Sequence, residues 1–103
     1  MGVKFANNAT GYLSASISAS DVGLVLEAGQ GARFPALGAG EYFFATLVNP
    51  SGEYEIVQCT ARSVDSLAIT RAQEGTTARS FVAGARCELR VTAQGLVNLA
   101  GGV

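Results

Sequence analysis

Short segments in which apolar and polar residues alternate recur along most of this chain. Alternation with a period of two is typical of half-buried β-strands. Stretches rich in Gly, Pro, Ser, Asn and Asp, which favour turns, separate these segments. The expected strands are residues 11–18, 22–26, 41–48, 53–61, 67–70 and 85–91. About six short strands at this spacing predict an all-β fold, a small antiparallel β-sandwich or a partly open barrel.

Residues 41–61 predict a β-hairpin. The first half is rich in aromatic and β-branched residues, which favour strands. The tetrapeptide Asn49-Pro50-Ser51-Gly52 fits a type I turn, with Pro at its second position and Gly at its fourth. The second half alternates, and its better core face holds Glu55, Val57, Cys59 and Ala61.

The remaining strands also have one face that is predicted to be inward. These positions are Leu13, Ala15, Ile17, Val22, Leu24, Leu26, Cys87, Leu89 and Val91. Phe34 and Leu37 stand in the loop 32–40 and are expected to cover one end of the core.

The chain has 103 residues, which is the size of a single domain. Three parts are expected within it. Residues 1–10 form an extended N-terminal arm and residues 11–91 form the β-domain. Residues 92–103 form a short C-terminal helix, capped by Thr92, and a tail.

The composition narrows the classes of partner. Charged residues make up 15% of the chain and the formal net charge is −1, so the basic surface that nucleic-acid binding requires is missing. The sequence contains no apolar run of 18 residues, so we expect no membrane span. Hydrophobic residues make up 49%, but many are Ala, which predicts a thin core. A weakly charged surface over such a core suits burial in an assembly.

The residue types that catalysis and metal binding most often need are scarce. The chain has no His, which excludes nucleophilic Ser–His and Cys–His pairs, and it also has no Cys-x-x-Cys pair, so a zinc site is not expected. Cys59 and Cys87 lie in apolar patterns that favour buried free thiols over a disulfide. Glu53 and Glu55 could form a carboxylate pair, but two solvated glutamates beside a turn are the expected arrangement. We therefore predict no enzymatic activity, no cofactor, no metal and no small-molecule substrate.

The segment from Arg71 to Arg79 is a polar excursion that carries both charge signs on a chain with few charges. Two interpretations stand beside each other. Glu74 can pair with Arg71 or Arg79 and brace the loop internally. Alternatively, the two arginines reach a neighbouring subunit, since Arg is enriched at interfaces.

Several segments, in this order and spacing, resemble a small domain of tailed-bacteriophage virion proteins, often found at the N-terminus of tail-fibre or tailspike chains. The matching residues are 4–8, 34–37, 40–48, 55–57, 60–63, 71–79, 81–84 and 88–93. In the proteins that this sequence resembles, the domain looks like an anchoring module. It docks to the virion, and the residues that follow it form the fibre or spike. In those relatives a shaft and a receptor-binding tip follow the domain, whereas this sequence stops at Val103. Host recognition is therefore not expected of it.

The resemblance implies a virion protein, assembled in the host bacterial cytoplasm, that acts as a tail adaptor joining fibres or spikes to the tail. Its partners would be other phage structural proteins and copies of itself, in a trimer or a ring. A head decoration protein is the alternative. A carbohydrate-binding module is a third reading, although the chain has no Trp for sugar stacking. The candidate interface residues are Lys4, Phe5, Asn7, Asn8, Arg71, Glu74 and Arg79.

Overall fold

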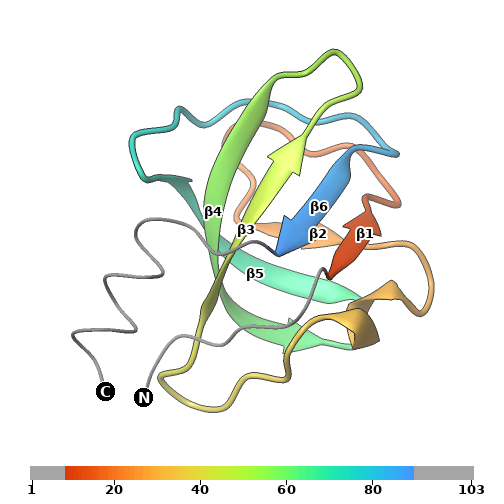
Figure 1. Cartoon of the computed structure of the whole chain (residues 1–103), viewed down its shortest axis with the longest axis vertical. Coiled ribbons are helices and arrows are strands. Elements are labelled where there is room, and N and C mark those ends of the chain that lie inside the picture. The colour runs from red at the N-terminus through yellow and green to blue at the C-terminus, as the bar shows by residue number, and fades with distance from the viewer. Residues whose placement is uncertain (1–8, 90–103) are drawn as a thin grey trace.

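The computed structural model describes residues 9–89, and within this range six strands form one antiparallel sheet (Figure 1). The order across the sheet is β1-β6-β3-β4-β5-β2. The elements are β1 (Thr10–Tyr12), β2 (Gly23–Val25), the 3-10 helix η1 (Gln30–Arg33), β3 (Phe43–Val48), β4 (Tyr54–Ser63), β5 (Ser66–Gln73) and β6 (Arg86–Leu89).

The sheet curls until its two edge strands meet at one end. Leu13, just after β1, and Leu26, just after β2, form an antiparallel bridge. The Glu27 amide donates to the Tyr12 carbonyl at 2.9 Å, and the Ser14 amide donates to the Val25 carbonyl at 2.9 Å. The prediction of an all-β fold is confirmed, in its partly open barrel form.

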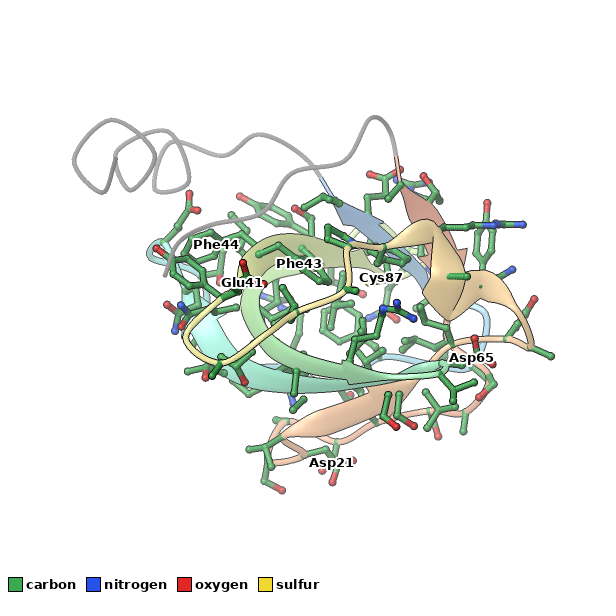
Figure 2. The ribbon with its side chains drawn as sticks, turned by 90° about the horizontal axis from the view of Figure 1, so that it is seen from below. Asp21, Glu41, Phe43, Phe44, Asp65 and Cys87 are labelled. Carbon is green, nitrogen blue, oxygen red and sulfur yellow. The ribbon has the colours of Figure 1, made fainter. Side chains whose placement is uncertain are left out.

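Alternating side chains fill the interior of the barrel. Figure 2 shows Phe43 and Cys87 within the space that the sheet encloses, and Asp21 on an outer loop. The largest fully buried apolar side chains are Phe43, Phe81, Leu13, Leu26, Leu47, Leu67, Val57, Cys59 and Cys87.

The predicted hairpin is confirmed. Strand β3 pairs with β4 from Phe43 opposite Cys59 to Val48 opposite Tyr54. The Gly52 amide donates to the Asn49 carbonyl at 2.8 Å, which closes the turn. Phe34 also covers one end of the core as expected, since its ring stacks on Phe43 with centroids 5.7 Å apart.

Three positions predicted to face the core are exposed instead: Ala15, Val22 and Ala61. The chain bends at residues 14–15, which ends the alternation that began in β1. Val22 precedes the first residue of β2. A register shift between Cys59 and Ala61 in the β4–β5 pair turns Ala61 outward.

Several boundaries also differ from those expected. Strand β1 begins at Thr10 and ends at Tyr12, and the buried Ala9 accepts a hydrogen bond from the Leu89 amide at 2.9 Å, so the barrel includes the last two residues of the predicted arm. Strand β5 runs from Ser66 to Gln73, so the first three residues of the predicted polar excursion belong to a strand. Val91, the predicted C-terminal helix and the arm residues 1–8 lie outside the described residues.

A carboxylate clamp holds η1 against the β4–β5 turn. Asp65 accepts the Gly31 amide on Oδ1 at 2.8 Å and the Gly29 amide on Oδ2 at 3.2 Å. Gly31 lies so close to the turn that a Cβ built on it would overlap the Val64 carbonyl oxygen. The close approach of two backbones therefore requires glycine at this position.

We expect Gly31→Ala to lower the free energy of unfolding by at least about 3 kcal/mol, because the turn must move away from η1 to admit the methyl group. Urea denaturation measures this. Gly23→Ala is the matched control, since a Cβ at Gly23 meets no neighbour closer than 3.6 Å. Equal stability of the two variants would contradict the proposed constraint.

Candidate functional site

A buried ion pair ties the polar excursion to the barrel. Glu55 lies on β4 with its side chain fully buried, and Arg71 lies on β5 with 8% of its side chain exposed. Arg71 Nε donates to Glu55 Oε2 at 2.9 Å, and Arg71 Nη2 donates to Oε1 at 2.8 Å. The contact is a two-pronged guanidinium–carboxylate pair, which is the strong form of this interaction.

A bulge in β5 makes the pair possible. Ile56 is opposite Gln73 and Gln58 is opposite Thr70, so Arg71 and Ala72 together face one residue of β4. Ala72 has a φ of 56°, which is uncommon for a residue with a side chain. The kink directs the Ala72 amide at Glu55 Oε2, at 2.8 Å. Bulges commonly redirect a side chain in this way.

All five N–H groups of the Arg71 guanidinium have acceptors. Besides the two bonds to Glu55, Nη1 donates to the carbonyls of Ser18 and Asp21, both at 2.7 Å, and Nη2 donates to the carbonyl of Arg79 at 2.6 Å. One side chain thus joins β4, the connection between β1 and β2, and the end of the polar excursion. No donor of Arg71 is left for a partner protein.

Glu55 is equally well supplied. Its carboxylate accepts the two Arg71 bonds, the Ala72 amide and the Arg79 amide at 3.0 Å. Burial raises the pKa of Glu55, but the bonds from Arg71 and the two amides outweigh that effect and hold the pKa below its ordinary value. The group is therefore a fixed structural anion.

The rest of the excursion is held by further bonds. Thr76 Oγ1 donates to the Gln73 carbonyl at 2.7 Å and accepts the Ile56 amide at 3.1 Å. Asn49 in the β3–β4 turn donates from Nδ2 to the Ser80 carbonyl at 3.1 Å and accepts the Val82 amide at 3.1 Å. The segment 71–82 is thus fastened to the barrel at both ends and in the middle.

A shallow pocket, which we call the polar notch, lies between this segment and the β3–β4 turn. Its lining residues are Ser51, Gly52, Glu53, Tyr54, Glu74, Gly75, Thr76, Thr77 and Arg79. Glu74 Oε2 and Arg79 Nε are buried, and neither makes a hydrogen bond to a described residue. Tyr54 is 55% exposed beside them. The notch therefore offers both charge signs and an aromatic ring on a fixed frame.

The predicted site residues divide into three groups. Lys4, Phe5, Asn7 and Asn8 lie outside the described residues. Glu74 and Arg79 both line the polar notch. For Arg71 the expected partner is corrected: its guanidinium faces inward and pairs with Glu55 instead of Glu74, and its five donors are all used within the chain.

The expectation of two solvated glutamates holds for Glu53 and is wrong for Glu55. Glu53 is exposed, and its carboxylate accepts bonds from Ser51 and Asn49. Glu55 points inward because it shares the face of Val57 and Cys59 on β4. That alternation was visible in the sequence, and a lone acid within it was the signal for a buried ion pair.

The two cysteines are buried and free, as expected. Burial raises the pKa of Cys59 well above its ordinary value and raises that of Cys87 to about 12, so both remain thiols at neutral pH. Within residues 9–89, no group of three or more His, Cys, Asp or Glu side chains could hold a metal ion. The same range contains no helix long and apolar enough to cross a membrane.

No protein-family model matches this chain, and no curated protein matches it.

We expect Glu55→Gln to lower the free energy of unfolding by about 3–5 kcal/mol, because the substitution leaves the buried Arg71 guanidinium without its counter-charge. Urea denaturation measures the loss. Glu53→Gln changes an exposed glutamate on the same hairpin and should leave stability unchanged. If both variants were as stable as the natural chain, the ion pair would not hold the excursion.

The same pair predicts a loss of stability in acid. The pKa of Glu55 is lower in the folded state than in the unfolded chain, so its contribution is complete above the unfolded pKa, about 4.3, and is lost as the pH falls through the folded value. The difference in unfolding free energy between the natural chain and Glu55→Gln should therefore shrink below about pH 4. A difference that stays constant from pH 7 to pH 3 would contradict this.

Proposed function

We propose that this protein is a non-enzymatic structural component of a bacteriophage virion, a tail adaptor that joins fibres or spikes to the tail and works in several copies. The segments from residue 4 to residue 93 that resemble phage anchoring domains support the assignment to a virion. The all-β barrel is compatible with that resemblance.

The observation that carries the proposal is the fixed polar notch. Binding between proteins is weakened by the entropy of ordering loops and side chains at the interface. The bonds from Glu55, Arg71 and Thr76 hold the notch backbone in place before any partner arrives. The notch is therefore suited to docking against a protein of fixed shape.

The side chains of the notch fit the same role. Tyr and Arg are enriched at protein interfaces, and both are present in Tyr54 and Arg79. Glu53 and Glu74 add carboxylates, so a partner with its own mixed charges would bind in a defined register. The buried atoms Glu74 Oε2 and Arg79 Nε lack hydrogen bonds to described residues, and a partner can supply them.

The test is mass spectrometry of purified virions, with copy number per particle as the readout. A tail adaptor should be present in about six to a few dozen copies, set by the symmetry of the tail. Hundreds of copies would assign the protein to the head as a decoration protein. Absence of the chain from purified particles would refute the proposal.

Variants of the polar notch test its role in docking. We expect Tyr54→Ala combined with Arg79→Ala to reduce incorporation into particles about tenfold or more, because such residues carry much of the energy of an interface. Thr60→Ala, an exposed change on β4 outside the notch, is the control. Normal incorporation of the double variant would show that the partner binds elsewhere.

A further inference from the structure

The barrel is closed along only part of the seam between its edge strands. The bonds beside the Leu13–Leu26 bridge join the Tyr12 carbonyl to Glu27 and the Val25 carbonyl to Ser14. If the two edge strands continued to pair in the same register, the next residues to exchange backbone hydrogen bonds would be Ser16 and Gly23. No hydrogen bond joins them within the described residues, so the seam opens at this point.

The open seam leaves β2 without a hydrogen-bonded neighbour at Gly23, beyond the point where Ser14 pairs with Val25. In the β2–β5 pair, the Ile69 amide donates to the Val22 carbonyl and the Leu26 amide donates to the Asp65 carbonyl. Because an antiparallel ladder alternates, Gly23 and Val25 direct their backbone groups away from β5. Of these groups only the Val25 carbonyl has a partner in residues 9–89, the amide and hydroxyl of Ser14. An unpaired edge of this kind accepts an extended strand.

A groove of about 570 Å³ runs along this edge. Its lining comes from three parts of the chain: residues 15–17, residues 21–25, and residues 61–63 and 66–68. Most of these side chains are small or apolar, and Val22 and Val25 are exposed. The charged members are Asp21 and Arg62, and Arg62 donates to the carbonyls of Pro35 and Val64.

The sequence before Ala9 has the pattern of a strand that would fit this groove. In Val3-Lys4-Phe5-Ala6, the large apolar residues Val3 and Phe5 stand on either side of Lys4, and Ala6 is small. Val and Phe favour strands and suit the apolar lining. Lys4 complements Asp21, which is the carboxylate of the groove.

Geometry separates this segment from the groove of its own chain. Phe5 is four residues from Ala9, a reach of at most about 14 Å. The path from Ala9 along β1 to Ser14, one residue before the groove lining starts at Ala15, is about 17 Å at the rise of a strand. Phe5 therefore cannot lie beside Gly23 of the same chain, but it can lie beside Gly23 of another copy.

We propose that the arm segment Val3–Ala6 of one copy adds as a strand to the free edge of β2 in the next copy, and so links copies head to tail. The inference rests on the proposed function only in requiring that copies assemble. A head-to-tail contact closes into a ring when the rotation between copies permits.

The experiment uses light scattering after size-exclusion chromatography to measure the oligomeric state of the full chain against concentration. The decisive variant is Gly23→Pro. It removes the Gly23 amide N–H, which makes no hydrogen bond to β5, and proline is tolerated at such positions of edge strands. Gly23→Ala is the matched control, because it adds a side chain of similar position and keeps the amide. Phe5→Asp changes the arm and alters no residue of the six strands.

We expect the natural chain and Gly23→Ala to form the same oligomer. Gly23→Pro and Phe5→Asp should each raise the dissociation constant of that oligomer at least about tenfold. Amide hydrogen exchange adds a site-specific readout, since exchange at Gly23 and Val25 should be slower in the natural oligomer than in Phe5→Asp.

A natural chain that remains monomeric at high concentration would overturn the inference, as would an oligomer that neither variant weakens. Phe5→Asp keeps the test decisive if Gly23→Pro fails to fold. The proposed function is tested separately by the virions. An arm-linked oligomer absent from particles would refute the function alone, and a virion protein whose copies do not use β2 would refute this inference alone.

Discussion

The Glu55–Arg71 ion pair is the interaction on which the outer surface of this domain depends. Two charges removed from water are costly unless every bond they can make is made. Here the carboxylate accepts four bonds and the guanidinium donates five, and the acceptors come from three separate parts of the chain. The pair therefore fixes the backbone of the polar excursion more than it fills the core. The bulge at Arg71 and Ala72, with its unfavourable φ, persists because this network holds it.

The two ends of the barrel are closed by different chemistry. At the end nearest η1, the rings of Phe34 and Phe43 stack, and Asp65 clamps the backbone at Gly31. At the end nearest the β3–β4 turn, the Glu55–Arg71 ion pair covers the core, and the polar notch lies on the solvent side of this pair. The polar end combines stability with a surface that a partner can bind.

The sequence predicted those parts of the fold that depend on local patterns. The hairpin 41–61 was accessible because turn chemistry and alternation act within a few residues. Leu24, Leu26, Cys87 and Leu89 were assigned inward for the same reason. The ion pair was not predicted, because Glu55 and Arg71 are 16 residues apart and meet only through a bulge that no residue type marks. A second register shift turned Ala61 outward, and a bend at residues 14–15 did the same for Ala15. Within the candidate site, Glu74 and Arg79 were found from charge alone, while the inward role of Arg71 required its three-dimensional partners.

The filled interior of the barrel limits where new specificity can arise. Phe43, Phe81 and Leu47 are fully buried inside the barrel, and protein interiors are close-packed, so changes of side chain there disturb the core. Divergence among proteins built on this frame would therefore be concentrated in the turn at Asn49–Gly52 and the loop that follows β5. These segments can exchange side chains while the packed lumen keeps them at a constant distance from one another.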